Sequence, residues 1–98
     1  MTLAIRFDPA ARHEMLEAAD FYDLQQPGLG HEFLDEVESA LDVISEHPAA
    51  SPTGLGETRT HAISRFPYSI MYWFDEHHVT VTAVAHHRRR PGYWGTRK

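Results

Sequence analysis

The segment Tyr68–Phe74 is almost wholly apolar, and this constrains the fold more than any other feature of the chain. Because side chains alternate along an extended strand, one face carries two tyrosines, an isoleucine and a phenylalanine, and the other carries Met71 and Trp73. A strand with two apolar faces must lie inside a sheet that is covered on both sides. Helices can cover one side, whereas the other needs either the C-terminal tail or a partner protein.

Two amphipathic helices are expected before this strand. Asp8 can cap the first helix and Pro9 suits its first turn, so the helix is predicted to run from there to near Gln26. The sequence Pro27-Gly28-Leu29-Gly30 interrupts it and is short enough to make the second helix an antiparallel neighbour. The second helix has its own apolar stripe and is predicted to end at His47-Pro48.

Strands account for most of the remaining chain. Residues 2–7 alternate before the helices, and residues 58–64, Tyr68–Phe74 and residues 79–85 have the composition of strands after them. The predicted order is β-α-α-β-β-β, an α+β fold in which a helical hairpin packs on a small sheet and the last three strands form an antiparallel meander. We expect one domain over residues 1–98, because a chain of this length builds one small core.

Charge is divided unevenly along the chain, whose formal net charge is −5. Residues 1–57 hold two arginines against twelve carboxylates, whereas residues 58–98 hold seven basic side chains against two carboxylates. The acidic half disfavours broad nonspecific binding to nucleic acid, and the basic half can still dock on a local anion. Without cysteine, a long apolar run or a secretory signal, the chain reads as a soluble intracellular protein with no membrane partner.

The basic charge is concentrated in an aromatic tail, residues 86–98, which we call the tail throughout. Guanidinium groups hold anions in a fork and aromatic rings stack, so such a segment can bind RNA, grip an acidic protein surface or cut a phosphodiester bond. Each residue also has a structural interpretation. The arginines can be solvated or paired with the acidic helices, and Tyr93 and Trp94 can pack in the core.

Three motifs together resemble the RelE/ParE superfamily, the toxins of bacterial type II toxin-antitoxin modules, and the resemblance covers nearly the whole chain. They are Pro27-Gly28-Leu29-Gly30 followed by Phe33, Arg65-Phe66-Pro67-Tyr68-Ser69-Ile70 at the start of the central strand, and Val84-Ala85-His86-His87-Arg88-Arg89-Arg90-Pro91-Gly92-Tyr93-Trp94 at the end. The resemblance implies a cytoplasmic, growth-inhibiting toxin of the plasmid-stabilisation kind. It also implies a hetero-oligomer with a cognate antitoxin, which would wrap the toxin and repress the shared operon.

The superfamily offers two mechanisms of toxicity. RelE-like members resemble ribosome-dependent mRNA endoribonucleases, whereas ParE-like members resemble proteins that bind and poison DNA gyrase. The nuclease type carries basic side chains at three positions that fall here on Thr60, Ala62 and Ser69. These gaps favour a ParE-like toxin that binds its target. A degenerate member that binds only its antitoxin and acts as a corepressor is a third possibility.

If the chain is a nuclease, its candidate catalytic residues lie in and around the tail. His86 or His87 would take the proton of the attacking ribose hydroxyl, and Tyr93 would protonate the leaving oxygen. Arg88, with Arg65, would stabilise charge on the phosphorus. Adjacent strand residues point to opposite faces, so at most one of the two histidines is expected at any single site.

Binding to a target or to the antitoxin is expected to use cationic and aromatic side chains, with no metal and no cofactor. An antitoxin segment is expected to add along the apolar sheet face or the helical hairpin and to bring carboxylates to Arg59, Arg65 or the arginine run. The predicted binding residues are Arg59, Arg65, Tyr68, Tyr72, Arg88, Arg89, Arg90, Tyr93, Trp94 and Arg97.

Overall fold

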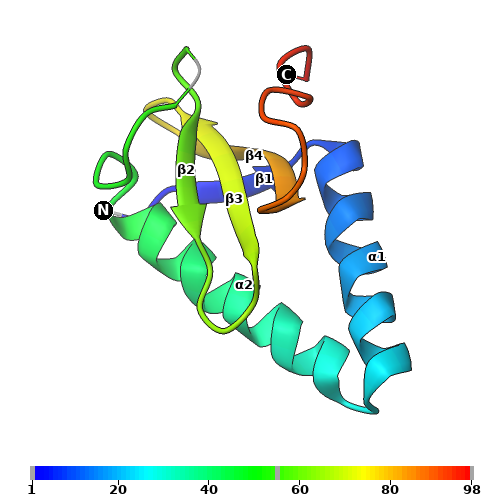
Figure 1. Cartoon of the computed structure of the whole chain (residues 1–98). Helices are drawn as coiled ribbons and strands as arrows, with labels where there is room; N and C mark the ends of the chain where they lie inside the picture. The colour runs from blue at the N-terminus through cyan, green and yellow to red at the C-terminus, as the bar shows by residue number, and fades with distance from the viewer. Residues whose placement is uncertain (1, 55, 98) are drawn as a thin grey trace.

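The computed structural model describes residues 2–54 and 56–97, and it has the predicted order of elements (Figure 1). Two helices, α1 (Pro9–Gln25) and α2 (Leu29–Glu46), lie on one face of a sheet. The sheet contains four strands: β1 (Ala4–Phe7), β2 (Arg59–Ala62), β3 (Tyr68–Phe74) and β4 (His78–His86). Among these residues no helix is long and apolar enough to cross a membrane. The α+β class is therefore confirmed.

The helical hairpin is held by its turn. Asp8 accepts a hydrogen bond from the amide of Ala10 at 2.8 Å and caps α1, as the sequence predicts. Gly28 precedes α2 with a φ of 89°, a conformation that favours glycine. Gly30 lies where the helices approach closely, and its amide donates to the carboxylate of Asp23 at 2.8 Å. A β-carbon at Gly30 would overlap the carbonyl oxygen of Ala19, so this position requires glycine.

The sheet has the strand order β1-β4-β3-β2. The predicted meander is confirmed, because β2 pairs antiparallel with β3 and β3 pairs antiparallel with β4. The sheet as a whole is mixed, however, because β1 pairs in parallel with β4. The helical hairpin carries the chain to the far edge of the sheet, and the meander then returns to place β4 beside β1. β1 reaches only from His78 to Val81 of β4, which leaves the rest of that edge without a strand.

The face of the sheet that meets the helices holds the larger part of the core. Ile70 and Tyr72 of β3 are fully buried there with Phe33 of α2. The rings of Phe33 and Phe66 meet edge to face at 5.3 Å, and the Phe33 and Tyr68 rings lie 5.1 Å apart. The alternation of side chains along β3 therefore correctly predicts which residues face the helices.

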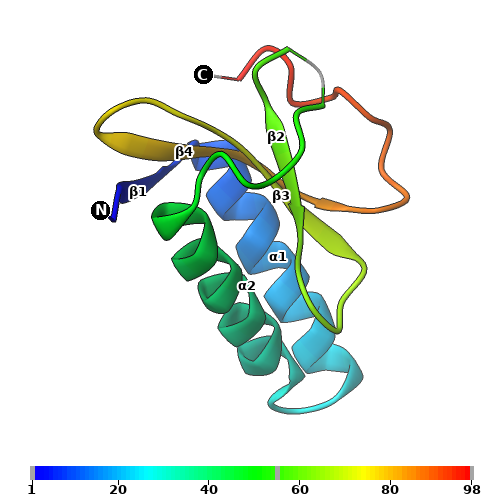
Figure 2. The ribbon, with the colours of Figure 1, turned by 90° about the vertical axis from the view of Figure 1, so that its left-hand side faces the viewer.

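The outer face of the sheet is covered by the tail, which folds back across it (Figures 1 and 2). Trp94 packs there on Met71, Ala83 and Ala85 and retains only 8% of its exposure. The sequence allowed two ways to cover the outer face of β3, the tail or a partner protein, and in the structure the tail packs on this face. Lys98, the last residue of the tail, lies outside the described residues.

Candidate binding site on the outer face of the sheet

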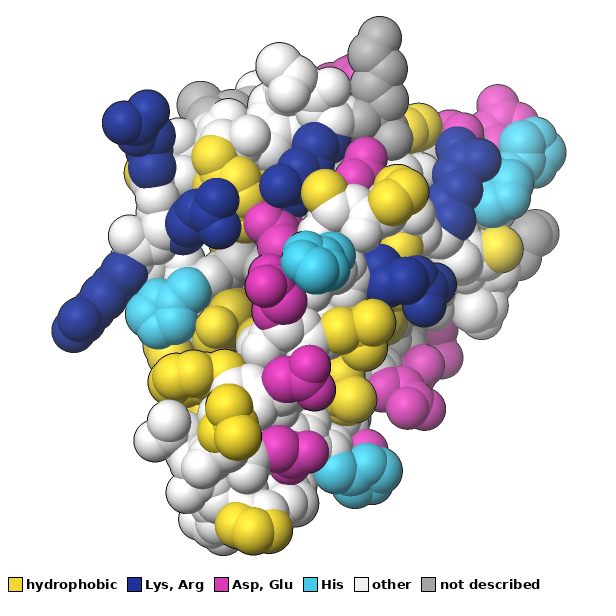
Figure 3. Space-filling view, turned by 90° about the vertical axis from the view of Figure 1, so that its right-hand side faces the viewer, with side chains coloured by type: hydrophobic (Ala, Val, Ile, Leu, Met, Phe, Trp, Pro, Cys, Tyr) yellow, Lys and Arg dark blue, Asp and Glu magenta, His cyan; other side chains and the backbone are white. Residues whose placement is uncertain are grey.

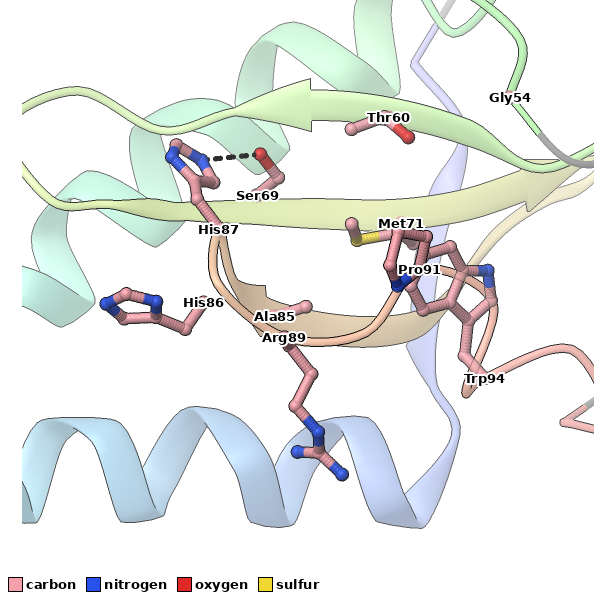
Figure 4. Close-up of a pocket in the computed structure, with 10 residues that line it drawn as sticks. All are labelled: Gly54, Thr60, Ser69, Met71, Ala85, His86, His87, Arg89, Pro91 and Trp94. Carbon is pink, nitrogen blue, oxygen red and sulfur yellow. Dashed lines mark hydrogen bonds between the residues drawn. The ribbon is translucent and has the colours of Figure 1, made fainter.

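A cavity of about 350 Å³ opens on the outer face between β2, β3 and the tail (Figure 4). Met71 and Ala85 come from the sheet, and Pro91 and Trp94 come from the tail, so these four side chains make the cavity largely apolar. Its complete lining consists of Gly54, Thr60, Ser69, Met71, Ala85, His86, His87, Arg89, Pro91 and Trp94. No carboxylate contributes to that lining, so the polar side chains at the rim are neutral or cationic.

The end of β4 organises the polar rim. His87 Nε2 lies 2.9 Å from the hydroxyl of Ser69, and the backbone amide of His87 donates to the carbonyl of Pro67 at 2.8 Å. His86 Nδ1 accepts from the amide of Arg88 at 3.0 Å. The rings of the two histidines point to opposite sides of the sheet, as strand alternation predicts (Figure 4). The His87 ring meets Ser69 on the outer face, whereas the His86 ring meets Tyr68, which faces the helices.

Glu14 of α1 anchors the tail, and sequence reasoning did not find it. One carboxylate oxygen accepts from Arg97 at 2.9 Å and from the amide of Val84 at 3.2 Å, on the edge of β4 that β1 does not reach. Arg97 also donates to the carbonyl of Thr82 at 3.0 Å. The signal for Glu14 is its position, because it lies on the same side of the helix as the buried alanines Ala11 and Ala18.

Tyr93 lies between two arginines instead of facing the cavity. The guanidinium carbon of Arg89 is 4.0 Å from the ring centroid, and that of Arg97 is 5.1 Å from it. Burial raises the pKa of Tyr93 strongly, and the neighbouring Glu14 raises it further. The phenol is therefore a poor proton donor, and it does not line the cavity with the histidines. The predicted catalytic set is not brought together at one point.

Two of the predicted binding arginines make contacts within the chain. Arg59 donates to the carbonyl of Ser51 at 2.6 Å and packs over the ring of Phe74. Arg65 forms an ion pair with Glu32 at 2.6 Å, and this hydrogen bond raises the pKa of Arg65. Neither residue lines the cavity. The charge of Arg65 is matched by Glu32, and the guanidinium of Arg59 is engaged by backbone carbonyls, so both side chains are less available to a partner than the sequence suggested.

The two predicted tyrosines face the helices. Tyr72 has no exposed surface, and its hydroxyl donates to the carbonyl of Pro48 at 2.7 Å. The expectation that Tyr72 contacts a partner is therefore wrong, because the helical hairpin covers it. Tyr68 is half-buried against the aromatic cluster, and its ring meets that of His86 edge to face at 5.1 Å.

The tail arginines differ in their surroundings. Arg89 lies 3.9 Å from Glu14, and Arg97 is held by the same carboxylate. Arg88 and Arg90 are exposed, and among residues 2–54 and 56–97 no carboxylate lies within 4.0 Å of either. These two side chains are therefore available for an anion outside the chain.

The positions at which a nuclease would carry cations lie beside the cavity. Thr60 and Ser69 line it directly, and Ala62 pairs with Ser69 across the two strands. Hydroxyl and methyl groups thus occupy the positions that would hold charge against a phosphodiester. Nor does any group of three or more potential metal ligands occur within the described part of the chain.

Comparison with known proteins identifies the family. The family model described as the ParE toxin of the type II toxin-antitoxin system parDE matches residues 5–91. The chain belongs to this ParE toxin family. The resemblance seen in the sequence is thus confirmed, and the protein is a type II toxin of the ParE-like kind. A search of curated proteins gives no match.

A solved structure supports the fold of this ParE-family chain. The "Chromosomal ParDE TA system from P. aeruginosa" contains a chain that aligns with a TM-score of 0.76 over 87% of this chain and 96% of that one. The two sequences are only 12% identical, so the likeness concerns the fold alone. The outer cavity must therefore be interpreted from the side chains that this chain carries.

Proposed function

We propose that this ParE-family toxin inhibits growth by binding a macromolecular target, DNA gyrase, without cleaving RNA. The observation that carries the proposal is the composition of the outer cavity, which has an apolar interior and a cationic rim. Thr60, Ala62 and Ser69 stand where a nuclease needs positive charge, and Tyr93 is turned away with a raised pKa. Such a surface is suited to recognition of another protein rather than to phosphoryl chemistry.

The antitoxin is proposed to bind along α1 and to form a hetero-oligomer with the toxin in the cytoplasm. Leu16, Phe21 and Leu24 of α1 are exposed large apolar side chains, and Leu24 retains 86% of its exposure. Figure 3 shows hydrophobic side chains scattered among acidic ones on this face. A second hollow, of about 330 Å³, lies between α1 and β4 and is bordered by Phe21, Val84 and Glu17. An antitoxin segment that orders on binding can cover this surface.

The test of the proposed function begins with induction of the toxin without its antitoxin, which should arrest growth. Purified toxin should then inhibit the supercoiling activity of DNA gyrase, while mRNA on translating ribosomes stays intact. Unchanged plasmid topology at saturating toxin contradicts the gyrase proposal. Normal growth on induction would instead support a corepressor that lacks toxicity.

The nuclease alternative rests on one group of contacts, the Ser69–His87 pair beside the exposed Arg88. If purified protein cuts mRNA on translating ribosomes, His87→Ala and Arg88→Ala should each abolish cutting and leave the fold intact. Neither side chain is buried, so loss of cutting in these variants would report chemistry and not unfolding. Cutting that survives both substitutions would exclude these residues as its catalysts.

A further inference from the structure

The outer cavity has the dimensions of an anchor site for one side chain. At about 350 Å³ it is large enough to hold a bulky apolar group, but it is too small to form a protein interface alone. Trp94 is a rigid aromatic wall and Met71 is a flexible floor, a combination that adapts to apolar guests. Binding energy in protein interfaces concentrates where such an anchor fills a desolvated pocket.

The rim of the cavity selects the charge of whatever approaches. His87 belongs to the lining, and the exposed Arg88 and Arg90 lie in the same turn. The side chains of His86 and Arg89 point toward α1, where Glu14 lies 3.9 Å from Arg89 (Figure 4). The positive charges next to the mouth are therefore those of Arg88 and Arg90, and Glu14 lies outside the lining. The mouth of the cavity is therefore cationic, although the chain as a whole is acidic. Carboxylates next to the guest side chain would be attracted, and cationic segments would be repelled.

We propose that the cavity anchors a linear segment of the target protein that carries one bulky apolar side chain flanked by aspartate or glutamate. This inference rests on the proposed function and adds the chemistry of the segment that the toxin recognises. The target is favoured over the antitoxin because a stable antitoxin complex needs a larger apolar area. The exposed side chains of α1 offer that area, whereas the outer cavity offers one anchor and steering charges.

Thr60 provides a variant that fills the cavity without disturbing the core. It is half-buried at the cavity wall on the edge strand β2, so Thr60→Phe would place a ring in the space reserved for the guest. Thr58→Phe is the matched control. Thr58 precedes β2, is also half-buried, and borders a different hollow beside Trp73. Both variants should fold, which circular dichroism and thermal unfolding can check.

The first experiment measures direct binding by fluorescence polarisation. The probes are fluorescein-labelled Glu-Asp-Phe-Asp-Glu, the same peptide with alanine in place of phenylalanine, and a single-stranded RNA pentamer. The phenylalanine peptide should bind at least about tenfold more tightly than the alanine peptide, and more weakly as salt rises. Thr60→Phe should remove this preference, whereas Thr58→Phe should keep it. Tighter binding of the RNA, or equal binding of the two peptides, would overturn the proposal.

The second experiment separates the target from the antitoxin. Thr60→Phe should lose growth arrest and gyrase inhibition yet still co-purify with the co-expressed antitoxin, whereas Thr58→Phe should keep all three properties. If Thr60→Phe stays toxic but no longer binds the antitoxin, the cavity binds the antitoxin and not the target, and the proposal is refuted. If the unaltered toxin fails to inhibit gyrase but binds the phenylalanine peptide selectively, the gyrase proposal fails and the anchor site stands.

Discussion

The two faces of the sheet are covered in different ways. The inner face is packed by two helices through a continuous cluster of aromatic rings, in which Tyr22, Phe33, Phe66 and Tyr68 meet at short distances. The outer face is covered by a tail that relies on Trp94 and on the polar contacts of Glu14. The inner layer therefore determines the fold. The outer layer can be altered with less effect on stability, which suits a surface used for recognition.

A change in the inner layer should have the largest effect on stability. Gly30→Ala would press a methyl group against the carbonyl of Ala19 and to within 2.8 Å of the Asp23 side chain, forcing α1 and α2 apart. We expect the free energy of unfolding to fall by about 3 kcal/mol, measured by urea denaturation.

Gly54→Ala is the control for this substitution. The nearest atom to a β-carbon at Gly54 is the hydroxyl of Thr60 at 3.7 Å, an ordinary contact, so stability should hardly change. If both variants lose the same free energy of unfolding, the close approach of α1 and α2 at Gly30 is not what stabilises the inner layer.

A change in the outer layer should cost less and act locally. Glu14→Gln keeps the shape of the side chain but removes the charge that holds Arg97 and attracts Arg89. The free energy of unfolding should fall by about 1–2 kcal/mol, because hydrogen bonds to a charged group are lost. Trypsin should also cleave the tail at Arg88–Arg90 faster than in the unaltered protein.

Glu17→Gln controls for the loss of one negative charge on the same helix. The side chain of Glu17 is 67% exposed and lies 3.3 Å from His13, also on the surface, so its removal should leave tail cleavage unchanged. If trypsin cleaves the tail of Glu14→Gln no faster than that of the unaltered protein, the negative charge of Glu14 is not what holds the tail on the sheet.

The same contrast explains what could be predicted from the sequence. The inner layer depends on periodic apolar positions and on local signals such as Asp8, Pro9 and Gly28, and these are visible along the chain. The strand Tyr68–Phe74 was predicted with its bounds and its two faces. The parallel pairing of β1 with β4 was not predicted, because no local pattern records which edge a distant strand joins.

The outer site was only partly predictable. The tail was identified by its composition, but composition does not show that Tyr93 turns away, that Tyr72 is buried, or that Glu14 is the anchor. Nor does composition show that Arg59 donates to the carbonyl of Ser51 or that Arg65 pairs with Glu32 of α2. Charge and residue type indicate what a side chain can do, and tertiary contacts decide what it is free to do.

The smallest expected effect on stability is a pH dependence that arises where the edge strand β2 contacts the loop before it. His61 is half-buried with its Nδ1 3.0 Å from the hydroxyl of Ser51, and burial lowers its pKa. A histidine whose folded pKa lies below its unfolded value of about 6.5 contributes stability that is present above that pH and is lost as the pH falls below it. Since much of the ring is open to solvent, the loss should stay below about 1 kcal/mol.

The measurement compares the free energy of unfolding of the unaltered protein and His61→Gln by urea denaturation at pH 7.5 and pH 5.5. Histidines elsewhere contribute equally to both proteins, so the difference between their pH dependences isolates this ring. The unaltered protein should lose slightly more stability on acidification than the variant. A steeper loss of stability in His61→Gln would mean that the folded protein stabilises the charged form of His61, and that burial beside the loop before β2 does not lower its pKa.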